Sequence, residues 1–395
     1  MNECLYTEPQ KAGVIVCIPV HNEADSILDC LAALARQDYA ADFDVLLLLN
    51  NCTDATALIA GTFCAPSLMR VHVVERWLPP RLANAGNARR IAMAAGRELA
   101  GDKGVLLCTD ADAVVPPNWI SRSMQLIAEG ADAVAGRIEM AAHDAERLPR
   151  RMHDDEAAAQ LLTRLMDEID WLVDPDPADP WPRHTEHSGA SIAVTCAAHD
   201  AAGGVPAIAS SEDRAFFAAL RRVDARIRHA TDVVVTVSGR LEGRAAGGMA
   251  ETLKRRLAGP DRWLDDCIEG AEPHYRRACA RRALRALYNR PLGAVNWGEI
   301  EKAAAELALQ PQNISRMLQE APSFGALWHT AETKSSALRR RRVRAKAISA
   351  EIAAALAIIQ GYGDAPDRSG FAPLPMVVEN ELPMDGVLPG KVSPH

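Results

Sequence analysis

Short runs of apolar, mostly β-branched residues alternate with helix-length amphipathic segments over about residues 12–140, and this alternation is the strongest constraint on the fold. The alternation predicts strands over 14–19, 44–49, 71–75 and 104–109, with helices over 24–36, 53–63 and 84–99 between them. Strands joined by crossovers of ten or more residues form a mainly parallel sheet. The runs VIVCIPV and VLLLLN are apolar at almost every position, as in strands covered on both faces. The sequence therefore predicts an α/β fold with a Rossmann-like sheet and flanking helices.

The pattern changes after residue 140. Four prolines within 173–183 exclude regular structure there, so we interpret 141–187 as an insertion that is helical at first and then proline-rich. Strand-like sequence returns at 191–195 and 232–237, and an Ala-, Arg- and Leu-rich helical stretch follows from about 249. We divide the chain into an N-terminal extension (1–11), an α/β domain carrying the insertion (12–257), a helical C-terminal region (258–360) and a poorly ordered tail (361–395).

Composition excludes several classes of protein. The 44 Lys and Arg against 52 Asp and Glu give a net charge of −8, which disfavours nucleic-acid binding. The longest apolar runs fall far below the roughly 20 residues of a membrane-spanning helix, and we expect no signal peptide. Nine cysteines without metal-ligand spacing indicate reduced thiols and a cytoplasmic protein.

Two carboxylates two residues apart, Asp110 and Asp112, follow a strongly apolar strand. Both can face one divalent ion, and an oxygen-rich, partly open site of this kind suits Mg²⁺ or Mn²⁺ bridging a diphosphate. The alternative is that Asp110 caps the next helix or sits in a turn. Polar motifs also follow the other strands, where open α/β sheets bind their ligands.

The order of these motifs closely resembles that of family 2 glycosyltransferases with the GT-A fold, from about residue 12 to 257. The motifs are PVHNE (19–23), NNCTDAT (50–56), GNARR (86–90), TDAD (109–112), GAS (189–191), GGVP (203–206) and SEDR (211–214). The resemblance implies an inverting enzyme that uses a nucleotide-diphosphate sugar donor and a hydroxyl acceptor. It implies donor binding by Pro19, Glu23, Asn50, Asp54, Arg89 and Asp110, a metal at Asp110 and Asp112, and a general base at Asp213.

Two departures from the family pattern are visible. Leu49 and Asn50 stand where the family usually carries an aspartate pair, which leaves the nucleotide base open, although an amide can still hydrogen-bond a base. The Gln-x-x-Arg-Trp signature of processive polymer synthases is missing, so synthesis of an extruded polysaccharide is disfavoured.

The chemistry of two further segments supports a functional role without reference to the family. Glu212 and Asp213 open a predicted helix, and a positioned carboxylate is the usual acceptor for the proton of an attacking hydroxyl; alternatively both only favour the helix dipole. The glycine-rich stretch 237–248 carries Arg240 and Arg244, and we predict a mobile loop whose arginines neutralise the leaving diphosphate. The alternative is a surface linker.

The remaining candidates are isolated residues. His229 is a candidate third metal ligand, and Trp181 and His187 are candidate acceptor contacts, although single residues of these kinds are more often structural. The basic run within 339–359 is usually a solvated face, with docking on a membrane surface or a partner as the alternative.

Two rival functions stay open. A catalytically inactive GT-A module could act as a nucleotide-sugar-binding or scaffold subunit. Another nucleotide-dependent enzyme on a doubly wound sheet is the other rival, but a nucleotidyltransferase or dehydrogenase would place a glycine-rich loop after the first strand, where PVHNE stands.

Overall fold

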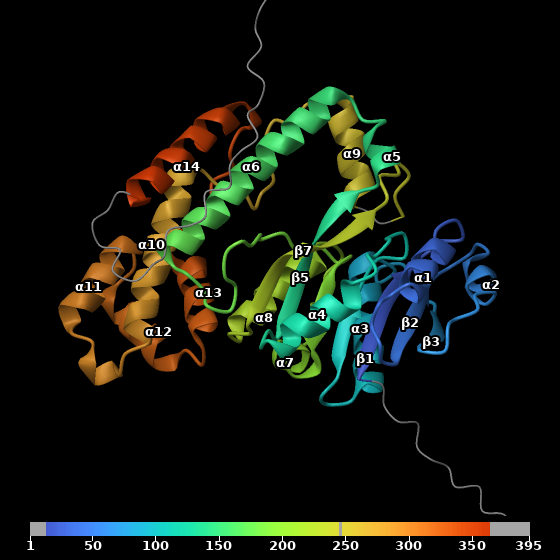
Figure 1. Ribbon diagram of the computed structural model, residues 1–395. Helices are drawn as coiled ribbons and strands as arrows, with labels where there is room; N and C mark the ends of the chain where they lie inside the picture. The colour runs from blue at the N-terminus through green and yellow to red at the C-terminus, as the bar shows by residue number, and fades with distance from the viewer. Residues whose placement is uncertain (1–12, 245–246, 364–395) are drawn as a thin grey trace, which may run out of the picture.

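A seven-stranded, mainly parallel sheet forms the centre of the part that the computed structural model describes, residues 13–244 and 247–363 (Figure 1). The strands are β1 (Val14–Val20), β2 (Phe43–Asn50), β3 (Met69–Arg76), β4 (Val105–Cys108), β5 (Ala133–Met140), β6 (Ile192–Thr195) and β7 (Ile227–Val237). They lie in the order β3-β2-β1-β4-β6-β5-β7. Only β6 runs antiparallel to its neighbours among these strands. The expected α/β class is confirmed.

Helices cover both faces of the sheet. They are α1 (Ile27–Ala35), α2 (Thr56–Ala60), α3 (Ala85–Ala100), α4 (Trp119–Ala128), α5 (Ala142–Ala145), α6 (Arg150–Val173), α7 (Cys196–Ala201), α8 (Glu212–Arg222), α9 (Met249–Ala258), α10 (Ala271–Tyr288), α11 (Trp297–Glu306), α12 (Pro311–Glu320), α13 (Phe324–Lys334) and α14 (Ile348–Gly363). Leu31 of α1 and Trp119 of α4 pack on one face, and Met93 of α3 and Phe217 of α8 pack on the other. This two-sided cover explains why the central strands are apolar at almost every position.

The strand β5 is absent from the sequence prediction, and β7 begins five residues earlier than predicted. The two strands pair in parallel with a bulge between Gly136 and Arg137. A Cβ on Gly136 would lie 2.9 Å from the carbonyl oxygen of Val233, so a glycine is needed where the strands approach. Glycine and charged residues break the apolar run that identifies a buried strand, so the sequence pattern does not reveal β5 or the first half of β7.

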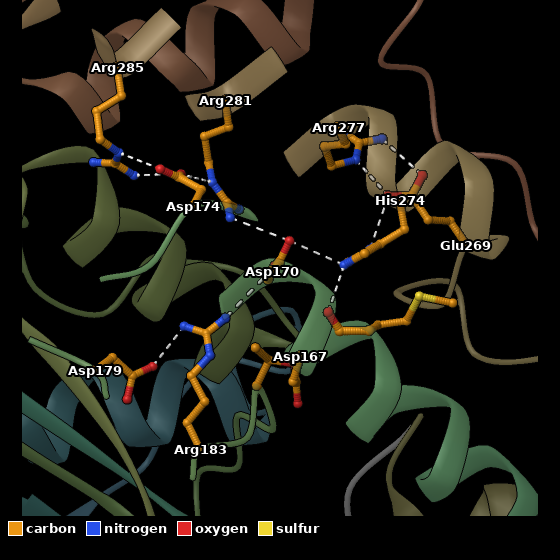
Figure 2. A network of polar contacts seen from close by, with 12 residues as sticks. Asp167, Asp170, Asp174, Asp179, Arg183, Glu269, His274, Arg277, Arg281 and Arg285 are labelled. Carbon is orange, nitrogen blue, oxygen red and sulfur yellow. Dashed lines mark hydrogen bonds and ion pairs between the residues drawn. The ribbon is translucent and has the colours of Figure 1, made fainter. Parts of the chain in front are cut away.

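The long helix α6 joins the α/β part to the C-terminal helices, because its apolar side packs against α10 and α14 (Figure 1). Figure 2 shows the polar side of this contact. Arg281 Nε lies 2.6 Å from Asp174 Oδ2, and His274 Nε2 lies 3.2 Å from Asp170 Oδ1. Burial alone would raise the pKa of Asp170, but Arg281 and His274 hold it well below its ordinary value. The predicted insertion and the C-terminal helices therefore share one core.

The remaining predictions concern membrane-spanning helices and the two ends of the chain. No helix within the described ranges is both long and apolar enough to cross a membrane. Helix α14 runs to Gly363, so residues 361–363 of the predicted tail are helical. The predicted extension 1–11 and the rest of the predicted tail, 364–395, lie outside the described residues.

Candidate functional site

The loops after β1, β2 and β4 meet at one edge of the sheet, because these three strands are parallel. Hydrogen bonds pin the first two loops together. Asn22 Oδ1 accepts from the backbone N–H of Thr53 at 2.7 Å, and Thr56 Oγ1 accepts from the backbone N–H of Glu23 at 2.7 Å. Thr56 Oγ1 in turn contacts Asp54 Oδ1 at 2.5 Å. Two of the predicted donor residues, Glu23 and Asp54, therefore lie side by side.

Two other predicted donor residues belong to the strands themselves. Pro19 is the second-last residue of β1 and pairs with Leu48 of β2. Asn50 ends β2, and its carbonyl oxygen accepts a hydrogen bond from His21 Nδ1 at 2.7 Å. The side-chain oxygen of Asn50 is buried and has no hydrogen-bond partner among the described residues. An unpaired buried acceptor costs about 1–3 kcal/mol, so a donor group arriving there would be stabilised.

Arginines from the loop after β7 bind the carboxylates of this edge. Arg240 Nη2 lies 2.6 Å from Glu23 Oε1 and 3.0 Å from Asp112 Oδ2. Arg244 also pairs with Glu23. The described part of the predicted phosphate loop thus reaches the predicted donor and metal residues, while its residues 245–246 lie outside the described chain.

A single buried guanidinium, that of Arg89, connects the acidic pair to the start of α8. Its Nη2 donates to Asp110 Oδ1 at 2.8 Å and its Nε donates to Glu212 Oε1 at 2.8 Å. Its Nη1 donates to the Gly189 carbonyl oxygen at 2.8 Å and contacts Cys108 Sγ at 3.0 Å. All three nitrogens of the Arg89 guanidinium are therefore used within the protein, and the segments at Asp110 and Glu212, which are distant in sequence, become neighbours.

The half-buried Asp213 is the next residue of α8 after Glu212. Its Oδ2 accepts from the backbone N–H of Gly189 at 3.1 Å, and its Oδ1 accepts from the backbone N–H of Arg214 at 2.7 Å. Burial raises the pKa of Asp213, and the neighbouring charge of Glu212 raises it further. A carboxylate with a raised pKa is a better proton acceptor, which is the property expected of a general base.

The acidic pair meets the chemical requirements of a divalent cation. Burial raises the pKa of Asp112 to about 6, and the charge of Asp110 adds to the effect. A carboxylate destabilised in this way is stabilised by a nearby cation, and carboxylate oxygens are the donors that Mg²⁺ and Mn²⁺ favour. Asp110 and Asp112 therefore fit such an ion.

His229 does not join this pair. Within the described ranges, the ligand atoms of His229, Asp110 and Asp112 do not lie within 4.8 Å of one another. His229 Nδ1 hydrogen-bonds Asp179 Oδ2 at 2.8 Å, and its Nε2 lies 3.1 Å from His187 Nε2. Burial lowers the pKa of both histidines. The two histidines therefore form a polar network with Asp179.

The other isolated candidates lie in different surroundings. Trp181 packs against Trp171 of α6 with ring centroids 6.2 Å apart. His187 stacks on Phe217 of α8 at 4.4 Å. Asp179, which binds His229, was not singled out in the sequence, and only its place in the proline-rich loop sets it apart.

Comparisons with known proteins match one family model over part of the chain. Residues 15–178 match the family model described as glycosyl transferase family 2. Residues 1–349 of S. aureus TarS in complex with UDP-GlcNAc are 18% identical, with 81% of this chain and 90% of that chain covered and a TM-score of 0.44. The mannosyltransferase PcManGT from Pyrobaculum calidifontis in complex with GDP-Man and Mn²⁺ is 18% identical, with 90% and 88% covered and a TM-score of 0.42. Among curated proteins, no match was found.

Proposed function

We propose that the chain is a glycosyltransferase, on the premise of the family match over residues 15–178, and that it transfers a sugar from a nucleotide-diphosphate donor to an acceptor hydroxyl with inversion. The observation that carries the proposal is the bridge made by Arg89 between Asp110 and Glu212. This bridge joins the carboxylates suited to a donor diphosphate and its metal to the helix that begins with Glu212 and Asp213.

Asp213 is the proposed general base. As the acceptor oxygen forms its bond to the anomeric carbon, the bond from that carbon to the diphosphate breaks and the hydroxyl proton passes to a carboxylate oxygen of Asp213. Attack from the face opposite the leaving group inverts the configuration. The backbone N–H groups of Gly189 and Arg214 orient the carboxylate, and the hydrogen bond from Arg89 Nε holds the adjacent Glu212 in place.

The leaving nucleoside diphosphate needs positive charge. Asp110 and Asp112 would hold Mg²⁺ or Mn²⁺, which supplies Lewis-acid stabilisation of the leaving group when it is bound. Arg240 and Arg244, which pair with Glu23, would transfer to the diphosphate, a partner with more negative charge.

Substitution of Asp213 tests this assignment. Asp213→Asn keeps the shape but accepts a proton poorly, so turnover should fall by roughly 10²–10⁴ while donor affinity changes little. Turnover is measured over a panel of nucleotide sugars and acceptors, and donor affinity by thermal shift with nucleoside diphosphates and Mn²⁺. Asp232→Asn, an exposed carboxylate paired with Arg122, is the matched control.

Three outcomes would count against the proposal. A variant that loses donor binding but keeps its turnover would make Asp213 a binding residue. Unchanged activity of the wild-type chain in EDTA would exclude the metal. Binding of a nucleotide sugar without turnover of any acceptor would favour the inactive, scaffold-type module.

A further inference from the structure

A pocket of about 470 Å³ lies between α9 and the basic segment that precedes α14. Its wall includes Trp263 and Leu264 from the stretch after α9, together with Arg262 and Arg342. The volume falls in the range of small-molecule sites, roughly 300–1,000 Å³. The pocket is lined only by residues of the C-terminal part, between Thr252 and Arg342. Glu23 and Asp112, at the edge of the sheet, do not line it.

Trp263 gathers three guanidinium groups around its ring. The Cζ atoms of Arg262 and Arg342 each lie 5.8 Å from the ring centroid, and that of Arg344 lies 5.2 Å from it. Cations within about 6 Å of an aromatic ring are attracted by its quadrupole, which offsets part of their mutual repulsion. The backbone fixes the arrangement, because the N–H of Leu264 donates to the Val343 carbonyl at 2.9 Å.

The carboxylates of the pocket are already used by other arginines. Asp261 binds both Arg255, at 2.8 Å, and Arg256, at 3.1 Å. Asp265 and Asp266 both bind Arg214, at 3.0 and 3.1 Å.

The three arginines around Trp263 are different. In the described ranges, none of Arg262, Arg342 and Arg344 makes an ion pair. Arg262 and Arg342 line the cavity, and the exposed Arg344 lies over the same ring beside them. Three positive charges without a carboxylate partner among the described residues therefore gather at one cavity, which is the arrangement expected of a site for an anion.

This pocket adjoins the proposed base. Arg214, whose guanidinium binds Asp265 of the pocket wall, is the residue after Asp213, and its backbone N–H donates to Asp213. The pocket wall and the base are therefore one arginine side chain apart.

We propose that this pocket binds the anionic end of the acceptor. The acceptor is then a hydroxyl compound that carries an oxyanion, which is either a phosphate monoester or a carboxylate. The proposal rests on the proposed function, since it assigns the acceptor class of the same reaction. Arg262, Arg342 and Arg344 recognise the oxyanion, and Trp263 holds their guanidinium groups in place.

Binding of matched probes to the full chain tests the proposal. Glucose 6-phosphate, glucuronate and glucose share a sugar ring, and only the first two carry an anion. Isothermal titration should detect binding of glucose 6-phosphate, glucuronate or both, and much weaker binding of glucose. The two anionic probes separate a phosphate site from a carboxylate site.

The pocket variant is Arg262→Gln, Arg342→Gln and Arg344→Gln combined. Loss of charge-assisted hydrogen bonds should weaken binding of the anionic probe by about tenfold or more. The matched control changes three exposed cations of the same basic run, Arg339, Arg341 and Lys346, to Gln, and should change the affinity less than about twofold because these residues neither line the pocket nor lie over Trp263.

A second variant, Trp263→Leu, should also weaken binding of the anionic probe, because the guanidinium groups lose the ring that orders them. Unchanged melting temperature and nucleoside diphosphate binding establish that the variants are folded. Wild-type affinity in the three-arginine pocket variant, or no preference of the wild-type chain for an anionic probe over glucose, would overturn the proposal.

The two proposals fail in different ways. Transfer to neutral acceptors without binding of the anionic probes would remove the pocket assignment and keep the glycosyl transfer. Pocket-dependent binding of the anionic probes without turnover of any donor would keep the pocket and remove the proposed reaction.

Discussion

Replacement of Arg89 tests whether one buried side chain holds the site together. The side chain of Arg89 is 7% exposed and bonds Glu212, which is equally buried, and Asp110, which is 35% exposed. Removing one partner of a buried ion pair costs about 3–5 kcal/mol, because the other charge stays buried without compensation. The more exposed Asp110 adds at most about 1 kcal/mol. Arg89→Met should therefore lower the free energy of unfolding by about 4 kcal/mol.

The double variant Arg89→Met with Glu212→Gln distinguishes this mechanism from a simple packing defect. The second change removes the charge that Arg89→Met leaves behind, so the double variant should be more stable than the single one, although still inactive. Urea denaturation gives the free energies. Arg97→Met, on the same helix but paired with the more exposed Asp200, should change stability little.

Two results would refute the reasoning about this bridge. A loss below about 1 kcal/mol for Arg89→Met would mean that water or rearrangement satisfies Glu212. Additive losses in the double variant would mean that the two side chains do not depend on each other.

Three further predictions follow from the charges of the site and its support. Protonation of Asp112, whose pKa burial raises to about 6, competes with a cation, so Mn²⁺ affinity measured by calorimetry should fall up to tenfold per pH unit below about 6 and level off above 7. Although burial alone would lower it, Asp170 raises the pKa of His274 to about 9. The folded pKa lies above the unfolded value, so the stability that His274 contributes, up to about 3 kcal/mol, is complete below pH 6.5 and is lost as the pH rises through 9. The free energies of unfolding of wild type and His274→Gln, measured by urea titration, should therefore differ most below pH 6.5 and converge above pH 9. The double variant Arg240→Ala and Arg244→Ala should weaken binding of nucleoside diphosphate more than of nucleoside, and equal losses for both ligands would reduce the segment to a linker.

The central sheet and the loops at its carboxyl edge could be predicted from the sequence because their signals are local. A buried parallel strand is apolar at each position, and the polar motif that follows it marks the strand end. The prediction placed Glu23, Asp54 and Asp112 on loops after β1, β2 and β4, and these loops meet as the parallel arrangement requires. Their chemical roles stay predictions.

Contacts between distant segments could not be predicted in this way. The bond from Arg89 to Glu212 spans 123 residues, and nothing near Arg89 in the sequence reveals that its guanidinium is buried. The basic run after residue 338 has the pattern of a solvated face. Two of its arginines instead lie over Trp263, about 80 residues earlier, because an isolated backbone bridge pairs Trp263 with Arg344.

The C-terminal helical region directly supports α8, the helix of the proposed base, so its contribution goes beyond covering the sheet. Helix α8 carries the proposed base in its first turn, and there Arg214 binds Asp265 of the segment after α9. Just beyond the last turn, Asp224 accepts hydrogen bonds from the backbone N–H groups of Phe324, at 2.8 Å, and Gly325, at 2.7 Å, at the start of α13. A helix held near both ends has little freedom to rotate or shift, and a shift of about 1 Å at a catalytic group can cost on the order of 100-fold in rate. The region that is hardest to interpret from sequence therefore holds both ends of the helix that carries the proposed base, and it forms the pocket around Trp263.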